Sequence, residues 1–263
     1  MKHKEDIMGE DLNINLVPDS WQVKQNIIKV VGVGGGGCNA VKQMFRDGIN
    51  DVEFLVCNTD SQSLIDSPII EKLQLGEGLG AGCDPEEGRR LAVEKVDEIK
   101  KRLSDGTKML FITAGMGGGT GTGAAPVIAK ISKEMGILTI AVVTQPFRDE
   151  GTEFLRRAYE GIQELSKNVD SLLIIDNQKI YDIYGDLNIW DAFPKADAVL
   201  QTAIKGIAEI ITGHGYINVD FADVRRVMKD SGMAIMGSGE ASGANRAEIA
   251  VERAFTSPLI KDY

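Results

Sequence analysis

Residues 114–126, AGMGGGTGTGAAP, hold six glycines and two threonines within thirteen positions. An ordered glycine loses more backbone entropy than any other residue, so a folded chain gathers glycines only where the backbone needs unusual conformations or a close approach to another group. The apolar run 109–113 comes directly before this stretch, and a helical pattern follows it. The stretch therefore predicts a glycine-rich turn between a buried strand and a helix.

A second glycine-rich turn, GVGGGGCNA at 32–40, also follows an apolar run. The apolar runs of this chain are nearly continuous, which is typical of a parallel sheet covered on both faces. Strands are predicted at 27–33, 52–57, 109–113, 137–144 and 172–175. Helices are predicted near 38–47, 86–104, 123–135 and 153–167. This alternation predicts an α/β fold with a doubly wound, mostly parallel sheet and helices on both faces.

The later part of the chain is predicted to be helical. Apolar residues at helical spacing over 195–212 indicate a long, well-buried helix. A loop with the sequence GHGYINVD follows, then a helix from about residue 222 and a last helix over 246–255. The first 26 residues lack an apolar core of the signal-peptide type and are expected to form a disordered tail.

Composition excludes several classes of function. Of the 263 residues, 43% are hydrophobic and 26% charged, as in ordinary soluble domains. The net charge of −10 argues against nucleic acid as a partner, and no apolar stretch approaches the roughly 20 residues that span a bilayer. Three cysteines without a C-x-x-C pair and two histidines favour neither a zinc site nor a disulfide framework. We therefore expect a cytoplasmic protein.

The two glycine turns lie at the same end of the predicted sheet. Backbone N–H groups in such turns, with the dipole of the following helix, bind phosphate. The spacing Gly32-x-Gly34-x-x-Gly37 matches the dinucleotide fingerprint, and Asp60 follows where the ribose-binding acid is expected. A dinucleotide fold needs no second dense glycine loop, however, and the standard P-loop motif does not occur. These patterns predict a nucleotide polyphosphate and leave its base open.

The motif GGGTGTG, residues 117–123, is the signature of the tubulin and FtsZ family. The segments IIKVVGVGGGGCNAV, NTDSQSL, GLGAGCDPE, VDSLLIIDN, INVDFADV and MGSGEASG resemble further FtsZ segments in the same order. The chain after residue 26 thus resembles the nucleotide-binding part of FtsZ, the bacterial tubulin-like cell-division GTPases. The resemblance implies a Rossmann-like GTP-binding domain over 27–198. Over 199–263 it implies a long central helix, a catalytic-loop segment and following helices, with the family's second domain absent.

The resemblance also implies which residues bind GTP or GDP. The first phosphate loop would comprise Gly35, Gly36, Gly37 and Asn39. The β and γ phosphates would lie on Gly118, Gly119, Thr120, Gly121, Thr122 and Gly123. The γ-phosphate and its Mg²⁺, held through the phosphates with no predicted protein ligand, would be bordered by Asp60, Ala81 and Gly82. Glu150 would contact the ribose, and the guanine pocket would comprise Asn177, Phe193 and Asp197. There Phe193 would stack on the base and Asp197 would accept from both N–H donors of the guanine edge.

Asn218, Asp220 and Asp223 are the candidate catalytic residues. The local pattern alone favours a helix N-cap at Asp220 with Asp223 as its capping partner. The resemblance implies instead that this loop reaches into the nucleotide site of the next subunit, where the aspartates polarise the attacking water. Hydrolysis would then depend on assembly, because positioning and charge neutralisation are what phosphoryl transfer mainly requires.

Other candidate residues also have local interpretations. Asn39 could cap the helix that follows it, Asp60 could cap a turn, and Phe193 could belong to the core. Cys38 lies inside the first loop without a histidine partner and is interpreted as a tolerated small residue.

The segment PFRDEGTEFLRR, residues 146–157, departs from the family pattern. Asp149 stands where the family usually has phenylalanine. Phe154 stands where an arginine or lysine commonly approaches the nucleotide, and Arg156 or Arg157, about half a turn further along, are candidate replacements.

Three functions follow as alternatives. The first is a GTPase that assembles with itself head to tail at the division septum. Its membrane tethers and regulators would bind only through an absent C-terminal tail, without direct contact to membrane or nucleic acid. The second is a fragment that binds GDP or GTP but neither polymerises nor turns over. The third is a dinucleotide-dependent oxidoreductase, for which the sequence offers no histidine-based acid or base.

Overall fold

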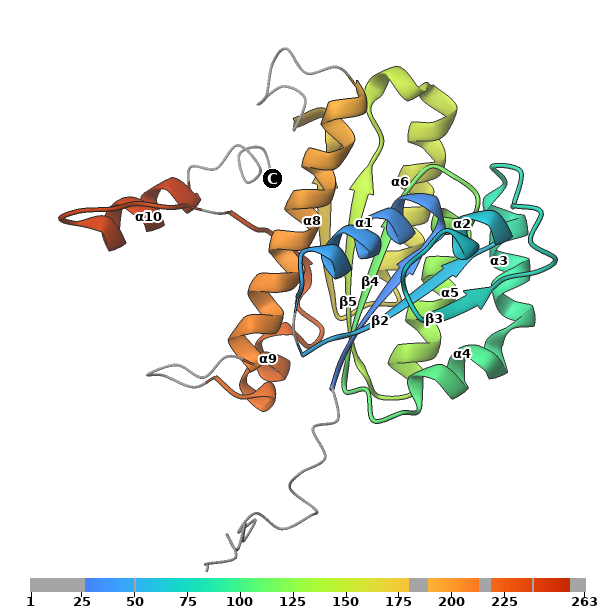
Figure 1. The fold of residues 1–263 in the computed structure, drawn as a ribbon, viewed down its shortest axis with the longest axis horizontal. Coiled ribbons are helices and arrows are strands. Elements are labelled where there is room, and N and C mark those ends of the chain that lie inside the picture. Colours follow the sequence, from blue (N-terminus) through green and yellow to red (C-terminus); the bar gives the residue numbers. More distant parts are fainter. Residues whose placement is uncertain (1–26, 50, 180–188, 213–218, 238, 256–263) are drawn as a thin grey trace, which may run out of the picture.

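The computed structural model describes residues 27–49, 51–179, 189–212, 219–237 and 239–255. Within these ranges seven strands form one parallel sheet in the order β3-β2-β1-β4-β5-β6-β7 (Figure 1). The strands are β1 Ile28–Val33, β2 Glu53–Asn58, β3 Glu71–Gln74, β4 Met109–Gly115, β5 Leu138–Gln145, β6 Ser171–Asp176 and β7 Gly232–Ala234. The order of the first six strands is that of a doubly wound nucleotide-binding fold, so the predicted fold class is confirmed.

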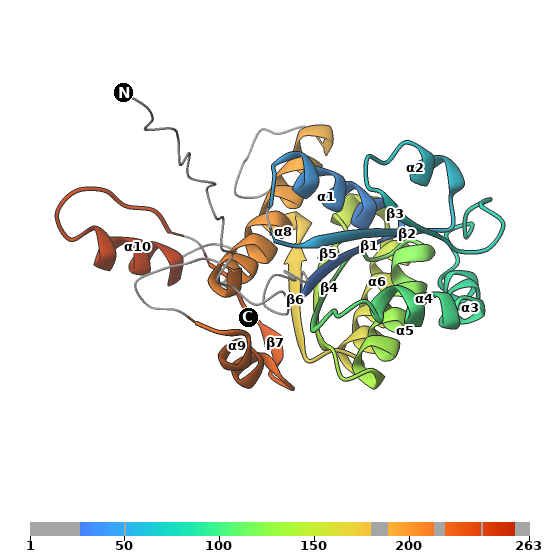
Figure 2. The same ribbon diagram turned by 60° about the horizontal axis from the view of Figure 1, so that its bottom comes forward.

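Helices connect these strands and cover both faces of the sheet. They are α1 Gly34–Arg46, α2 Ser61–Ile65, α3 Pro85–Glu94, α4 Val96–Leu103, α5 Thr120–Glu134, α6 Thr152–Ser166, α8 Ile189–Thr212, α9 Phe221–Met228 and α10 Arg246–Phe255. Figures 1 and 2 show α1 and α8 on one face and α3, α5 and α6 on the other.

The central strands send alternate side chains into two separate core layers. Along β1, Ile28 and Val30 belong to the layer under α1 and α8, whereas Val31 and Val33 belong to the layer under α3 to α6. Both sets are fully buried. This two-sided burial explains why the strands read as continuous apolar runs in the sequence.

The predicted strands and long helices are present. The structure adds three short elements that were not predicted and divides one predicted helix in two. Three elements, β3, β7 and α2, were not predicted, because β3 and β7 are short edge strands with little buried surface and α2 is five residues long. The predicted helix 86–104 divides at Lys95 into α3 and α4. The expected domain boundary after residue 198 falls inside α8, which continues through it. The expected N-terminal tail, 1–26, lies outside the described residues.

A buried lysine ties together the amino-terminal edge of the sheet. Lys29 on β1 is 0% exposed, and its Nζ donates to the carbonyl of Arg102 at 2.9 Å and pairs with Asp105. The carboxylates of Glu53 and Glu71 lie 3.4 and 3.5 Å from it. Burial alone would lower the pKa of Lys29, but these acids outweigh burial and raise it. Lys29 therefore stays charged and links β1 to β2, β3 and the turn before β4.

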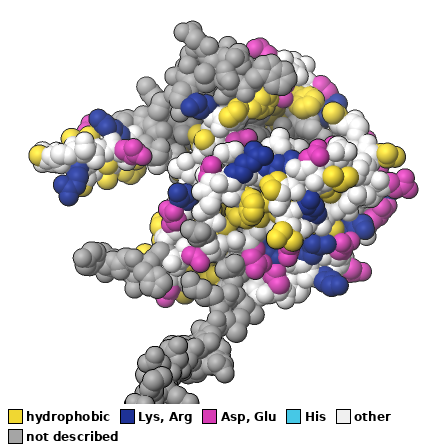
Figure 3. Space-filling view, viewed as in Figure 1, with side chains coloured by type: hydrophobic (Ala, Val, Ile, Leu, Met, Phe, Trp, Pro, Cys, Tyr) yellow, Lys and Arg dark blue, Asp and Glu magenta, His cyan; other side chains and the backbone are white. Residues whose placement is uncertain are grey.

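The surface carries charges of both signs. Figure 3 shows Lys and Arg side chains interspersed with Asp and Glu over the face that carries α1 and α8. Within the described ranges we find no helix whose length and apolar character would let it cross a membrane.

Candidate functional site

A cleft of about 1110 Å³ lies at the carboxyl ends of the strands. Its walls come from the segments that follow β1, β2, β4, β5 and β6, together with the first half of α8. In doubly wound sheets ligands bind at this edge, where the connections leave two adjacent strands for opposite faces. Here those strands are β1 and β4, and each is followed by one of the two glycine-rich turns.

The glycines of these turns fall into two groups. Gly35 and Gly118 line the cleft, and a side-chain carbon added to either would meet no atom within 4 Å. At Gly37 and Gly121 an added carbon would lie 2.2 Å from the Thr113 carbonyl oxygen and 2.5 Å from the Gly115 carbonyl oxygen. The first group leaves room for a ligand, and the second lets the two turns pack against the sheet and each other.

Helices α1 and α5 begin at the cleft with uncapped N-termini. Neither has a side-chain cap or an acidic residue in its first turn. By contrast, α2, α3 and α9 are capped by Asp60, Asp84 and Asp220. The first N–H groups of a helix need an acceptor, and the helix dipole favours an anion there. The glycine end of the cleft is therefore suited to phosphate groups.

Two threonines organise the second glycine turn. The hydroxyls of Thr59 and Thr120 lie 2.6 Å apart at the cleft wall, which joins the end of β2 to the start of α5. The hydroxyl of Thr122 accepts a hydrogen bond from the N–H of Gly117 at 2.8 Å. This bond stabilises the conformation of the turn 115–119.

The opposite end of the cleft offers an aromatic ring and two acceptors. Phe193 is 39% exposed, and its ring packs edge-on against Phe147, with centroids 5.2 Å apart. The side-chain oxygen of Asn177 is buried and has no hydrogen-bond partner among the described residues. Burial raises the pKa of Asp197 to about 6. A flat group with N–H donors on its edge would satisfy both acceptors and lie on the ring.

Most predicted ligand residues meet in this one cleft. Those that line it are Gly35, Gly36, Asn39, Asp60, Ala81, Gly118, Gly119, Thr120, Gly121, Glu150, Asn177, Phe193 and Asp197. Gly37, Gly82, Thr122 and Gly123 do not line it. At Gly123 an added carbon would lie 1.9 Å from the Pro85 carbonyl oxygen, so this glycine packs α5 against α3.

The structure agrees with some of the local interpretations of these residues and disagrees with others. Asn39 is not a cap, because α1 begins five residues earlier at Gly34. Asp60 both lines the cleft and caps α2, accepting from the N–H of Gln62 at 3.0 Å. Glu150 likewise lines the cleft, and one of its carboxylate oxygens also accepts a hydrogen bond from the N–H of Phe147 at 2.8 Å. Phe193 is too exposed to be a core residue.

Several residues that line the cleft were not predicted from the sequence. Asn58, Thr59 and Thr144 lie at or just beyond the carboxyl ends of β2 and β5, and Lys42 and Arg46 extend the row that Asn39 begins on α1. The signal for the first three was present, because polar residues that end an apolar strand face this edge of a parallel sheet. Helical spacing from Asn39 would have found the two cations.

Asp220 and Asp223 lie far from the cleft of their own chain. Asp223 donates its N–H to Asp220 Oδ1 at 2.9 Å and accepts from the N–H of Asp220 at 3.3 Å, which is the capping box predicted from the local pattern. Arg225 on α9 donates to the carbonyl of Gly136, just before the amino end of β5. The two carboxylates thus lie at the sheet edge opposite the cleft. Asn218 lies outside the described residues.

Cys38 is buried behind the first glycine turn. Its thiol donates to the carbonyls of Gly32 and Cys57, and burial raises its pKa to about 12. A thiol with such a pKa is not a nucleophile at neutral pH, in agreement with its interpretation as a small packing residue.

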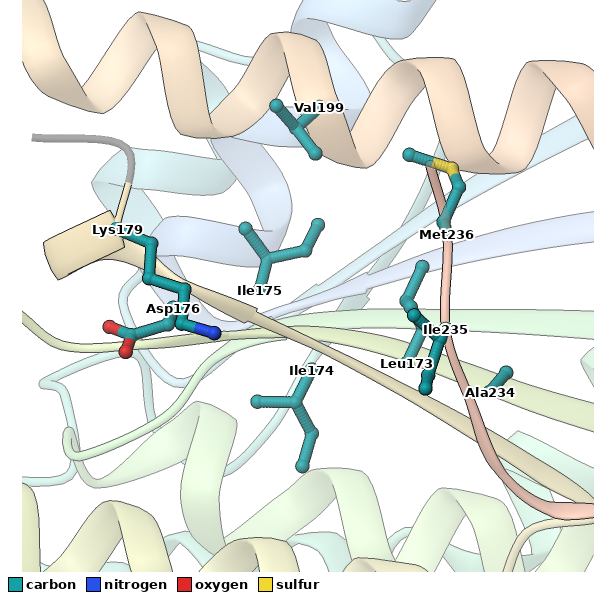
Figure 4. A pocket seen from close by; sticks show the side chains of 9 residues that line it. All are labelled: Leu173, Ile174, Ile175, Asp176, Lys179, Val199, Ala234, Ile235 and Met236. Atoms are coloured by element: carbon teal, nitrogen blue, oxygen red, sulfur yellow. The ribbon is translucent and has the colours of Figure 1, made fainter. Parts of the chain in front are cut away.

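A second, smaller pocket lies under α8, between β6 and residues 234–236. Figure 4 shows Ile175 of β6 and Val199 of α8 on its walls, with Met236 beside them. Its volume is about 10 Å³. That is about the space of a single water molecule, so it is too small for a nucleotide.

The two groups of glycines predict opposite effects of alanine. Gly35→Ala should leave the thermal unfolding temperature unchanged or raised, because the methyl group meets open space and alanine favours the helix. It should weaken nucleotide binding by about tenfold, a loss of about 1.4 kcal/mol, because the methyl group occupies the ligand's space. Gly121→Ala should destabilise the fold by about 1–3 kcal/mol, because its methyl group would clash with the Gly115 carbonyl. Calorimetric unfolding and nucleotide titration of both variants check this contrast, and equal losses of stability would contradict it.

Residues 27–185 match the family model described as Tubulin/FtsZ family, GTPase domain. The cell division protein FtsZ of Porphyromonas gingivalis is 50% identical over 258 residues, which cover 96% of this chain and 56% of that protein. FtsZ of Pseudomonas putida is 54% identical over 241 residues, covering 90% and 60%. The chain thus spans between half and two thirds of the length of these curated relatives.

A solved structure shows the same fold. An empty FtsZ dimer from M. jannaschii matches with a TM-score of 0.84 and 45% sequence identity, covering 89% of this chain and 69% of that one.

Proposed function

Because this chain belongs to the tubulin/FtsZ family, we propose that it is the guanine-nucleotide-binding domain of a GTPase that assembles head to tail into cell-division filaments. In this proposal GTP is hydrolysed at the contact between subunits, and the protein acts in the cytoplasm at the division septum. The relatives' names and the self-association of the M. jannaschii protein support it.

The proposal rests mainly on the different chemistry of the two ends of the cleft. The glycine end presents two uncapped helix N-termini and open space at Gly35 and Gly118, which suits a chain of phosphates. The other end presents the ring of Phe193 with the acceptors of Asn177 and Asp197. Guanine has adjacent N–H donors on one edge and matches these acceptors, whereas adenine does not present that pair.

The donor set also fits a magnesium ion carried by the phosphates. Asp60 supplies a carboxylate at the phosphate end, and the hydroxyls of Thr59 and Thr120 lie nearby. Oxygen donors of this kind suit Mg²⁺, which usually keeps several waters and binds through substrate phosphates and one or two carboxylates. When bound, the ion would neutralise charge on the β and γ phosphates.

The site is complete only when two copies meet. From Asp197 to the end of α8 at Thr212 the helix rises about 22 Å, and the carboxylates of α9 lie beyond that end. They cannot reach the cleft of their own chain, but a second copy stacked in the same orientation would bring its Asp220 and Asp223 to the open side of the cleft. There the carboxylates would orient and polarise water for attack on the γ-phosphate. Asn218 of the same loop is proposed to assist them.

Phosphate release from GTP, measured with magnesium over a range of protein concentrations, tests the proposal. Turnover per molecule should rise with concentration, because each active site needs two chains. Constant turnover per molecule would contradict the split site. Binding without release at any concentration would favour the second candidate, a domain that binds GDP or GTP without turnover. The observation in its favour is that Phe154 lines the cleft where a cation was expected.

A further inference from the structure

Two loops that touch each other form the phosphate end of the cleft. They are residues 78–84, before α3, and residues 115–119, before α5. A side-chain carbon added to Gly119 would lie 2.9 Å from Ala81 Cβ and 2.9 Å from the backbone nitrogen of Asp84. The loops are therefore in backbone contact, and a displacement of one displaces the other.

The 78–84 loop has an unusual backbone. Three of its glycines have positive φ, and so does Cys83, at 58°. A residue with a side chain rarely adopts this conformation unless its surroundings hold it there. Within the loop, the N–H of Asp84 donates to the Ala81 carbonyl and closes the turn around Gly82 and Cys83, and the N–H of Gly80 donates to the Thr59 carbonyl outside the loop. The carbonyl of Cys83 is held from outside the loop.

Arg157 of α6 holds that carbonyl. Its Nη1 donates to the Cys83 carbonyl oxygen at 2.7 Å, and its Nε donates to Glu153 at 3.1 Å. The guanidinium also lies over the ring of Phe154, 6.0 Å from its centroid. Phe154 in turn packs on the other loop, because a carbon added to Gly117 would lie 2.8 Å from its Cδ1. One side chain thus contacts the first loop directly and the second through Phe154.

We propose that Arg157 is a positioning residue that holds both phosphate-binding loops in place through Cys83 and Phe154. This inference rests on the proposed function. Arg157 does not itself line the cleft, so it acts on the nucleotide only through these two residues. The chain has an aromatic residue at 154 and the cation three residues later, at Arg157. Its charge stabilises the two loops from outside the cleft.

Arg156 provides a matched control on the same helix. Its side chain is 55% exposed, against 24% for Arg157, and it bonds to Glu153 and Glu160 of α6. Both arginines contact Glu153, so Arg156→Gln and Arg157→Gln each remove one positive charge and the bonding to this carboxylate, two hydrogen bonds from Arg156 and one from Arg157. Only the change at Arg157 also removes the bond to the 78–84 loop and the contact with Phe154.

Nucleotide affinity is the first measurement. With Arg157→Gln, affinity for GTP and GDP should fall about tenfold, as expected for loss of one charge-assisted hydrogen bond, whereas affinity for guanosine should not change. Arg156→Gln should leave all three affinities unchanged, and Arg157→Lys should recover part of the loss because it can still donate to the Cys83 carbonyl. An equal loss for GTP, GDP and guanosine, or no loss for any, would overturn the proposal.

Hydrogen exchange of the nucleotide-free proteins is the second measurement. The amides of 80–84 and 117–119 should exchange severalfold faster in Arg157→Gln than in Arg156→Gln, with the rest of the domain unchanged. Equal exchange in the two variants would overturn the proposal even if affinity fell. This measurement needs no ligand. If the unmodified protein bound no guanine nucleotide, the proposed function would fail, while exchange would still decide whether Arg157 holds the loops.

Discussion

Replacing Asp220 with serine should lower GTP turnover by about 10²–10⁴-fold, the range typical of a removed general base, while leaving nucleotide binding intact. Serine caps a helix about as well as aspartate, so α9 keeps its N-cap and only the carboxylate is lost. Asp220→Ala removes both the carboxylate and the cap, and should cost about 1 kcal/mol of stability in addition. Phosphate release, nucleotide titration and thermal unfolding of the two variants separate the two roles. Normal turnover in Asp220→Ser would show that Asp220 is a cap alone.

A mixing experiment sharpens this result. The mixture has two components. One is Asp220→Ser, whose cleft is intact, and the other is a variant whose cleft is damaged but whose Asp220 is intact. In an equal mixture, head-to-tail contacts that join an intact cleft to an intact Asp220 should restore about a quarter of the normal turnover. Each variant alone should remain inactive. A mixture as inactive as its components would contradict a site shared between copies.

Replacing Asp197 with asparagine should change which base the cleft accepts. The carboxylate offers two acceptors to the two N–H donors of the guanine edge, whereas asparagine offers one acceptor and one donor. Xanthine presents one N–H and one carbonyl oxygen on that edge and matches asparagine. We expect affinity for GTP to fall about 100-fold and XTP to become the preferred nucleotide, since each mismatched contact costs about 1–3 kcal/mol. Competition titrations with GTP and XTP measure this change of preference.

The same substitution should stabilise the ligand-free protein at neutral pH. The folded state raises the pKa of Asp197 from 3.8 to about 6, so it binds a proton more tightly than the unfolded state does. Stability therefore falls as pH rises from about 4 to 6, and the charged carboxylate costs about 1–3 kcal/mol at pH 7.5. Asp197→Asn removes this cost and should raise the unfolding temperature at pH 7.5 but not at pH 4. Guanine binding by the unmodified protein should weaken below pH 6, as the acceptor is protonated.

Asp176→Asn is the matched control for the change in nucleotide preference. Asp176 ends β6 next to Asn177, but its carboxylate accepts from the N–H of Gln178 and does not line the cleft. Nucleotide preference should not change in this variant. A shift toward XTP in this variant, or no shift in Asp197→Asn, would contradict the assignment of Asp197 to the base.

The central strands were predictable because burial on both faces leaves long apolar runs, as in β1, β4 and β5. The edge strands were not, since β3 buries one residue and β7 leaves Gly232 and Met233 exposed. Pairing with β2 and β6 forms these strands, and tertiary pairing has no local signal. The break at Lys95 was missed because α3 and α4 share one helical pattern.

Most of the candidate site could be predicted because its residues follow strands in sequence or carry a family motif. What could not be predicted is how individual side chains are used. Thr122 accepts a hydrogen bond from its own loop and does not line the cleft, and Gly123 packs against Pro85. The choice between Arg156 and Arg157 as the relevant cation depends on the Cys83 carbonyl, more than 70 positions away in sequence. Such contacts depend on the folded geometry of several elements, which local spacing does not encode.

Calorimetric titration of nucleotide-stripped protein with GDP, GTP, ATP and NAD tests the central claim most directly. The account predicts one GDP or GTP per chain, with no heat from ATP or NAD at the same concentrations. Binding of NAD, equal binding of ATP and GTP, or no binding of guanine nucleotides would contradict the assignment of this cleft.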